Sequence, residues 1–216
     1  MRLLHALLPG ALLLSWDAAD PPGAPWKEVR YSGRTRYAVV ERGGERILRA
    51  ESRDGNSALL HPLPIDPRGV TLRWRWRVLR HPAGADPEVR GRDDRAAGVL
   101  VIVRRGFLRL RTRAVLYQWT PARRAGFASR SPYSGEVRTI VLRDAPADSV
   151  WREESRDLAA DLAAAFGAAP RRIEAVGVIC DTDNTGAVAI AEFGALSLGM
   201  DPPAAKMLRP PCARRP

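Results

Sequence analysis

The sequence predicts an all-β sandwich of about ten strands with one short α-helix. Three observations support this fold class. Short apolar or alternating segments recur between glycine and proline turn signals along most of the chain. One of them, Val70–Leu79, alternates so that its apolar residues share one face and its arginines share the other. A single stretch, Ser155–Phe166, carries the fourfold apolar spacing of an amphipathic helix.

The strands are expected in the following order. Gly43-Gly44 separates two segments, Thr35–Glu41 and Glu45–Ser52, which predicts a β-hairpin. Ala97–Val103 is apolar on both faces, so we expect a central strand that is covered on each side. Further strands are predicted at Ser57–His61, which Pro62 and Pro64 should end, and at Thr112–Thr120, Val137–Arg143 and Val150–Glu154.

The helix predicted at Ser155–Phe166 has recognisable ends. Ser155 can serve as its N-cap, and Gly167 follows its last apolar residue. We therefore expect the helix to begin at Ser155, to end at Gly167 and to pack its apolar stripe against the sandwich.

Composition bounds the class of protein. The chain of 216 residues is long enough for one domain with a substantial core. Its formal net charge of +11 invites a nucleic-acid hypothesis. However, only two of the 35 basic residues are lysines, and the arginines are scattered along predicted strands instead of forming a block. We therefore expect no nucleic-acid partner.

The ends of the chain predict export. Residues 1–19 are interpreted as a signal peptide, because an early arginine precedes a leucine-rich run too short to span a bilayer. The alternative is a strand or helix that packs on the domain. Prolines and a glycine make 20–26 a linker. One domain is expected over 27–200 and a disordered tail over 201–216, in a periplasmic or secreted protein without a transmembrane segment beyond the leader.

The arginines of Val70–Leu79 are the first candidate ligand site. Arg75 and Arg77 share one face of the predicted strand. Guanidinium groups suit carboxylated or phosphorylated ligands, so this face could bind such a ligand. The alternative is a half-buried sheet whose outer surface the arginines simply cover.

Aromatic residues offer a second candidate surface. Tyr117 and Trp119 share one face of their strand by parity. With Tyr133 and Trp151 they could stack on sugar rings. Each could equally belong to the core or its rim, and the sequence leaves the two interpretations open.

Asp93 and Asp94 end the polar loop His81–Arg95, just before the predicted central strand. Loops at the end of a central strand are common places for function. The two carboxylates could ligate a metal or hold arginines. The alternative is a solvated turn.

The densest set of oxygen ligands lies in the turn Asp181-Thr-Asp-Asn-Thr-Gly186, between two apolar strands. With Glu192, this turn follows the spacing of an EF-hand calcium loop except for a threonine at its fifth position. Strands instead of helices flank the turn, so we expect Glu192 to stand too far away to complete such a shell.

Two interpretations of this turn remain. One is a different Ca²⁺ site that uses Asp181, Asp183, Asn184 and backbone carbonyls. The other is a hairpin turn in which polar side chains bond the backbone and Gly186 takes a positive φ.

Motifs of the common catalytic mechanisms are absent from the sequence: it contains no G-x-S-x-G, no H-E-x-x-H and no C-x-x-C. A carboxylate pair, with Asp93 or Asp94 opposite Asp181 or Asp183, could hydrolyse a glycoside only at a suitable separation. We leave enzyme activity open and favour a protein without it.

Several of these residues occur together in a known family. The chain resembles the bacterial family called domain of unknown function 3047 over roughly residues 26–198. The blocks that carry the resemblance, in order, are Trp74-Arg-Trp-Arg-Val78, Asp93-Asp94, Tyr117 with Trp119, Pro132-Tyr133, Phe166-Gly167 and Asp181-Thr-Asp-Asn-Thr-Gly186. One departure is Cys180, which stands where a threonine is expected. The resemblance implies an exported protein with a jelly-roll-like β-sandwich and supplies no activity.

We therefore predict an exported binding module for a polysaccharide or another cell-envelope glycan. A carbohydrate-active enzyme that uses a carboxylate pair is the first alternative, and a groove containing such a pair would favour it. A structural envelope protein is the second alternative, and a flat apolar patch would favour it.

Overall fold

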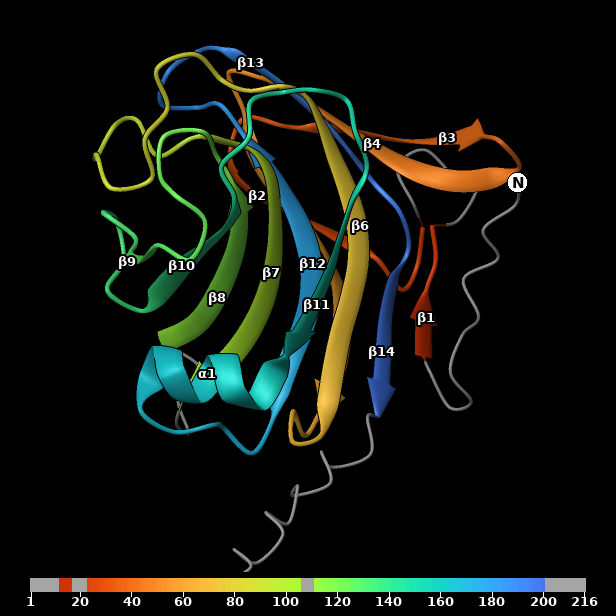
Figure 1. Cartoon of the computed structure of the whole chain (residues 1–216), viewed down its shortest axis with the longest axis vertical. Coiled ribbons are helices and arrows are strands. Elements are labelled where there is room, and N and C mark those ends of the chain that lie inside the picture. Colours follow the sequence, from red (N-terminus) through yellow and green to blue (C-terminus); the bar gives the residue numbers. More distant parts are fainter. Residues whose placement is uncertain (1–11, 17–22, 106–110, 201–216) are drawn as a thin grey trace, which may run out of the picture.

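The computed structural model describes residues 12–16, 23–105 and 111–200. Within this part the chain forms fourteen strands and one helix, and the strands make two seven-stranded sheets that pack face to face (Figure 1). The all-β sandwich with one short helix is confirmed. More strands are present than the roughly ten expected. Two of them, Leu12–Leu14 and Ala128–Arg130, have only three residues, and a break at Gly194 separates Val188–Phe193 from Leu196–Met200.

We call the two layers sheet A and sheet B. Sheet A contains, in spatial order, β1 (Leu12–Leu14), β14 (Leu196–Met200), β6 (Val70–Arg80), β13 (Val188–Phe193), β4 (Glu45–Arg53) and β3 (Arg36–Arg42), with β11 (Arg152–Asp157) also paired to β6. Sheet B contains β2 (Lys27–Ser32), β5 (Asn56–Ile65), β12 (Ile173–Asp181), β7 (Arg95–Arg105), β8 (Arg111–Trp119), β10 (Val137–Arg143) and β9 (Ala128–Arg130). The centre of sheet B is antiparallel, whereas β10 joins β8 in parallel.

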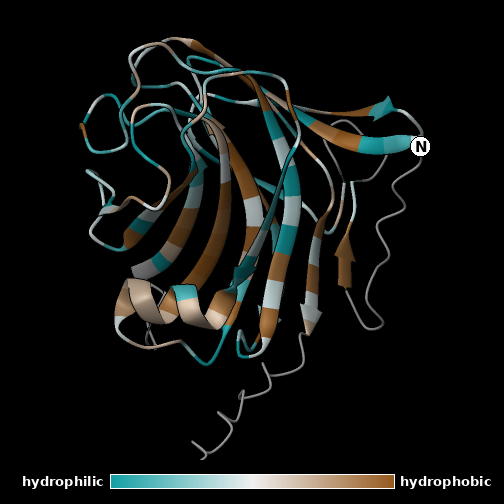
Figure 2. Cartoon of the chain, in the orientation of Figure 1, coloured by the Kyte–Doolittle hydropathy of each residue, from teal (hydrophilic) through white to brown (hydrophobic). Residues whose placement is uncertain are grey.

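The main core lies between the sheets. The apolar face of β6 turns inward, where Trp74 and Trp76 are buried and their rings meet at 5.5 Å. Trp74 also contacts Tyr117 of sheet B at 5.4 Å between ring centroids. Figure 2 shows teal segments of β6 that alternate with white and brown ones. Burial of each such side chain contributes about 1.5–3 kcal/mol, so the alternation in the sequence determines which face of β6 closes the sandwich.

A second apolar layer covers the opposite face of sheet B. Because side chains alternate along β7, Leu100 points away from the core that Val99 and Val101 face. Leu100 packs there with Leu116 and Ile179 of the neighbouring strands. The prediction that Ala97–Val103 forms a central strand with two apolar faces is therefore confirmed.

The helix α1 (Leu158–Phe166) is shorter than predicted. Ser155 belongs to β11, so the expected N-cap is wrong. The N-cap is Asp157, whose Oδ1 accepts a hydrogen bond from the Ala160 N–H at 3.0 Å. Gly167 ends the helix at φ 83°, as expected.

The proline signals in β5 were misleading. The strand continues through Pro62 and Pro64 to Ile65 instead of stopping at His61. β2 pairs with β5 only up to Leu60. Beyond this residue β5 has no neighbouring strand on that side, so prolines, which lack an N–H group, are tolerated there.

The turn after Asp181 does not form a hairpin. Asp181 ends β12 in sheet B, whereas Val188 begins β13 in sheet A, so residues 182–187 cross from one sheet to the other. The hairpin interpretation is therefore wrong, although Gly186 has the expected positive φ of 63°. Glu192 lies within β13, away from the turn.

The described part of the predicted leader belongs to sheet A. β1 pairs with β14, and Trp16 is fully buried with its indole N–H donating to the Phe193 carbonyl at 3.0 Å. This is the arrangement that the alternative interpretation expected, and export remains a prediction. The predicted tail at 201–216 lies outside the described residues. Among the residues that are described, no helix is long and apolar enough to cross a membrane.

Candidate functional site

A pocket of about 380 Å³ lies on the outer face of sheet B, the face turned away from sheet A. Its floor is apolar and consists of Leu100, Leu116 and Ile179 from three adjacent strands. These three side chains are at most 5% exposed. The second apolar layer of the sheet is thus the base of a recess.

Gly98 of β7 allows the floor residues to pack closely together. A Cβ atom at this position would lie 2.7 Å from Ile179 Cγ2 and 2.7 Å from Leu116 Cδ1. Both distances are below 3.0 Å, so a side chain at this position would force Ile179 and Leu116 to move.

Two half-exposed tyrosines form walls of the pocket. Tyr31 of β2 is 58% exposed, and Tyr133 before β10 is 51% exposed. The Tyr133 hydroxyl donates to Asn184 Oδ1 at 2.6 Å and accepts from the Gly91 N–H at 2.9 Å. These bonds hold Tyr133 in place, and the Arg90 guanidinium lies over its ring, 5.0 Å from the centroid.

Three residues on adjacent strands form one part of the polar rim. Asn56 of β5, Asp181 of β12 and Arg95 of β7 lie opposite one another in the register of sheet B. Arg95 is only 9% exposed and donates from Nη1 to Asp181 Oδ2 at 2.7 Å and from Nη2 to Asp93 Oδ2 at 3.1 Å. Burial lowers the pKa of Arg95, but Asp181 and Asp93 more than offset this, so the pKa is raised.

Asp94 fixes the turn that crosses between the sheets. Its Oδ2 accepts from the Thr185 N–H at 2.8 Å and from the Thr185 hydroxyl, and its Oδ1 accepts from the Asn184 N–H at 3.1 Å. Burial raises the pKa of Asp94, yet its hydrogen bonds, with that from the Thr185 hydroxyl the strongest, together outweigh burial and lower the pKa. The hydrogen bonds to the turn therefore hold the Asp94 carboxylate in a fixed position.

The side chain of Asn184 joins the turn to the loop before β7. Its amide nitrogen lies 3.1 Å from Asp93 Oδ1, 3.1 Å from Asp183 Oδ1 and 3.2 Å from Asp94 Oδ1. An amide has two hydrogens for these three carboxylate oxygens. Negative charge therefore converges on this point of the rim.

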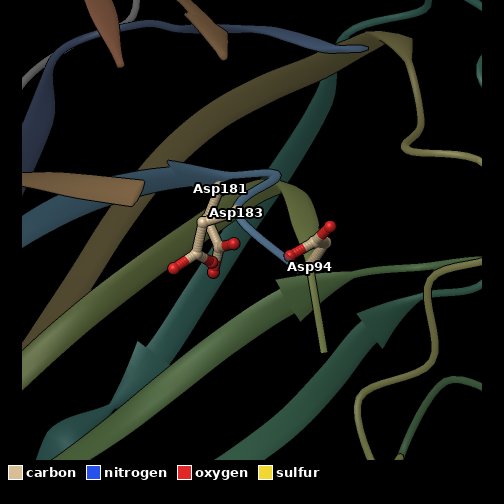
Figure 3. A group of neighbouring side chains, drawn as sticks. All are labelled: Asp94, Asp181 and Asp183. Carbon is tan, nitrogen blue, oxygen red and sulfur yellow. The ribbon is translucent and has the colours of Figure 1, made fainter. Parts of the chain in front are cut away.

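Asp181 is buried, and like Asp94 its side chain is only 1% exposed. Burial raises its pKa well above the usual range, Arg95 opposes this, and Asp94 and Asp183 add to it. Its Oδ2 is paired with Arg95, whereas its Oδ1 has no hydrogen-bond partner among the described residues. Figure 3 shows Asp181 and Asp183 on the turn, with Asp94 facing them from the other loop.

Five residues singled out from the sequence therefore meet at one place. Asp93 and Asp94 come from the loop before β7, and Asp181, Asp183 and Asn184 come from the end of β12 and its turn. The prediction that the Asp93-Asp94 pair could hold an arginine is met by Arg95.

Arg75 and Arg77 lie elsewhere, on the outer face of sheet A. Their guanidinium groups sit over the Trp151 ring, 4.7 and 4.8 Å from its centroid. Arg75 pairs with Glu45 and Arg77 pairs with Glu192. The structure therefore separates these arginines from the pocket by the full thickness of the sandwich.

The proposal of Tyr117 and Trp119 as ligand-facing aromatics is corrected. The parity was right, but their shared face turns to the core, and both side chains are 0% exposed. The Tyr117 hydroxyl donates to Asp161 and the Trp119 indole donates to the Ala145 carbonyl. No ring face remains for a sugar.

Sequence reasoning missed Tyr31, Asn56 and Arg95. Arg95 carried a signal, because an arginine that opens an apolar central strand needs a carboxylate partner when it is buried. Tyr31 and Asn56 carried none, since they reach the pocket only through pairing between distant strands.

Solved structures resemble this fold at low sequence identity. The family 30 carbohydrate-binding module of a cellulosomal cellulase from Clostridium thermocellum matches with a TM-score of 0.51 and 11% identity, over 90% of this chain and 99% of that one. The family 11 module of another cellulosomal cellulase from the same organism matches with a TM-score of 0.45 and 9% identity, over 87% and 96%. A cellulase derived from one of Rhodothermus marinus matches with a TM-score of 0.49 and 12% identity, over 88% and 99%. The first match shows a fold like that of the carbohydrate-binding module.

The sequence also matches one protein family. No curated protein matches the chain. The family described as Protein of unknown function (DUF3047) matches residues 24–197, which include both sheets apart from the first strand and the end of the last. On this match, the chain belongs to the DUF3047 family.

Proposed function

We propose that the pocket on sheet B binds a glycan. The observation that carries the proposal is the combination of an apolar floor, two half-exposed tyrosines and a polar rim in one recess. Sugar rings present apolar C–H faces and hydroxyl edges, which suit such a floor and such a rim respectively. A volume of about 380 Å³ lies within the range of small-molecule sites.

The fold adds support by analogy. The family 30 module that shares the architecture is, by its name, a carbohydrate-binding module. A fold hosts many functions, so the similarity raises the expectation and the pocket carries the inference.

The charge of the lining favours neutral or amino sugars over uronic acids. Asp93, Asp183 and Arg95 are the charged residues of the pocket wall. Arg95 is already committed to Asp93 and Asp181, so the charge left for a ligand is negative. An acidic glycan would meet repulsion here even though the whole chain carries +11.

The test is affinity electrophoresis through gels that contain soluble polysaccharides. The panel holds mixed-linkage β-glucan, xyloglucan, β-1,4-galactan and chitosan, with polygalacturonate as the acidic member. Tyr31→Ala and Tyr133→Ala should each lower the affinity about tenfold, because each removes roughly 60 Å² of apolar contact. The matched control is Trp151→Ala, which truncates an aromatic side chain beside the outer face of sheet A and should retain full retardation.

Two results would contradict the proposal. One is that the wild-type chain migrates freely in every gel. The other is that the three variants retard equally, which would place binding outside the pocket.

A carbohydrate-active enzyme is the second candidate. Asp93 and Asp183 line the same pocket, and the Asn184 amide nitrogen lies 3.1 Å from an oxygen of each. Burial raises the pKa of Asp93, as the acid of a glycosidase pair requires. Release of reducing ends from a bound polysaccharide, lost in Asp93→Asn, would establish this activity. Binding without release would leave a binding module.

We place this function in the periplasm or outside the cell, as the leucine-rich start of the chain suggests. Cleavage after residue 19 would remove Leu14 and Trp16, which are buried in the core. N-terminal sequencing of the protein from cell fractions decides this point. A mature chain that starts near Asp20 in the periplasm supports the predicted leader, whereas an intact Met1 in the cytoplasm contradicts it.

A further inference from the structure

The rim of the pocket concentrates negative charge within a basic protein. Asp93, Asp94, Asp181 and Asp183 lie together with Arg95 as their one basic partner in these contacts. Oxygens of Asp94, Asp181 and Asp183 all lie within 4.8 Å of one another. Like charges at such distances repel strongly where water is excluded, so the arrangement calls for further positive charge.

An unpartnered buried oxygen marks where that charge would act. Asp181 is 1% exposed, and its Oδ1 has no hydrogen-bond partner among the described residues. A buried carboxylate oxygen without a partner is costly, and native structures rarely leave one. Next to it across the sheet, Asn56 also keeps a buried Oδ1 without a partner. Both are hard oxygen ligands of the kind that Ca²⁺ prefers.

Asn184 occupies the centre of the same group. Its amide nitrogen faces three carboxylate oxygens, whereas its Oδ1 takes the hydrogen bond from Tyr133. Turned over, the same side chain would present an oxygen to the carboxylate group. A cation could then take the place that the amide nitrogen now occupies. It would be bound by the Asn184 oxygen and by the carboxylate oxygens around that place.

We propose that Asp94, Asp181 and Asp183 bind one divalent cation, with Ca²⁺ preferred, and that Asn184 contributes its side-chain oxygen. Ca²⁺ fits better than Mg²⁺, because the ligands come from two loops of irregular geometry and Mg²⁺ demands a near-ideal octahedron. Compared with the site expected from the turn alone, the structure adds Asp94 from a distant loop. The site adjoins the pocket but does not rest on glycan binding.

Calcium titration of the whole chain, after treatment with a chelator and exchange into metal-free buffer, tests the proposal. Calorimetry with CaCl₂ should give one site per chain, and MgCl₂ should bind at least tenfold more weakly. Free Ca²⁺ about 100-fold above the dissociation constant should raise the melting temperature by roughly 5–10 °C.

Asp183→Asn is the decisive variant, because Asp183 is only partly buried and asparagine keeps its shape. It should weaken Ca²⁺ binding at least tenfold. Asp181→Asn removes the partner of the buried Arg95 and is expected to impair folding, so it is not relied on. The control is Asp148→Asn, an exposed aspartate paired with Arg152, which should bind Ca²⁺ like the wild type.

Two outcomes overturn the proposal: no Ca²⁺ heat and no thermal shift in the wild-type chain, or equal binding by wild type and Asp183→Asn. Polysaccharide retardation is measured in parallel with Ca²⁺ and with chelator. If retardation persists while Ca²⁺ binding is absent, the cation site alone fails, and glycan binding stands.

Discussion

The Arg77 guanidinium of β6 bonds a single oxygen of Glu192 on β13, with Nε 2.8 Å from Oε2. Glu192 is 0% exposed, and its other oxygen accepts from Arg42 and Arg49 at 3.2 Å each. Burial raises the pKa of Glu192, but Arg77 and its neighbours outweigh burial and lower it. The single carboxylate of Glu192 thus ties four strands of sheet A together, because β13 carries it and β3, β4 and β6 supply its arginine partners.

Glu192→Gln should lower the free energy of unfolding by about 2–3 kcal/mol. The loss falls below that of a fully buried pair, because the Arg77 side chain keeps 19% of its surface in water. Urea denaturation measures it. The matched control is Glu45→Gln, since Glu45 is 54% exposed beside Arg75 and should cost at most about 0.5 kcal/mol. Equal losses in both variants would contradict this role of Glu192.

Substitutions of Tyr117 and of Asp161 should lower the free energy of unfolding by different amounts. The buried Tyr117 hydroxyl donates to Asp161 Oδ2 at 2.6 Å, and Arg156 donates to the same oxygen at 2.8 Å. Tyr117→Phe leaves Asp161 paired and should cost about 1 kcal/mol, whereas Asp161→Ala strands the hydroxyl and should cost about 2–3 kcal/mol. Chemical denaturation of both variants checks the order, and a reversed order would contradict the buried hydrogen bond.

Gly98→Ala should damage the floor of the pocket. The added methyl group would press on Ile179 and Leu116 at 2.7 Å, which we expect to cost about 1–3 kcal/mol of stability and to abolish polysaccharide retardation. Gly135→Ala is the control, because a Cβ at Gly135 meets nothing within 4 Å. Both variants are compared by urea denaturation and affinity electrophoresis. A Gly98→Ala chain as stable and as retarded as the control would refute the close floor.

His81 should make stability depend on pH below neutrality. Burial lowers the pKa of His81, partly opposed by a hydrogen bond to the Ala145 backbone. The unfolded chain then binds a proton more readily than the folded chain. The stabilisation is therefore complete above the unfolded pKa of about 6.5 and is lost as pH falls from there through the folded pKa.

Denaturation at about pH 7.5 and about pH 5.5 measures this loss. His81→Gln removes the titrating group, so the difference in unfolding free energy between the two pH values should shrink in the variant. An unchanged difference would show that other groups cause the loss.

Local patterns predicted the elements well where one face was buried. The alternation in β6 located its first residue, its last residue to within one position, and its inward tryptophans, because a slip of one residue would bury Arg75 and expose Trp76. The helix boundary was harder, since Ser155 and Asp157 are both good N-caps. Strand pairing decided between them, because Ser155 lies opposite Arg73 in sheet A.

The candidate site was predictable only in parts. Asp93-Asp94 and the Asp181 turn stood out as oxygen-rich segments, but their contact depends on β7 and β12 being neighbours in sheet B. The aromatic residues show the limit clearly. Tyr117 and Tyr133 looked equivalent in the sequence, yet the first is in the core and the second forms a wall of the pocket.

The sequence by itself determined the fold class, the register of alternation and the chemical character of each segment, because these follow from residues a few positions apart. Only the tertiary structure decided which face of each strand met the core and which strands became neighbours. These choices depend on closing two sheets over a shared interior. The pocket, the rim around Arg95 and the carboxylate group of Asp94 with Asp181 exist only after that closure.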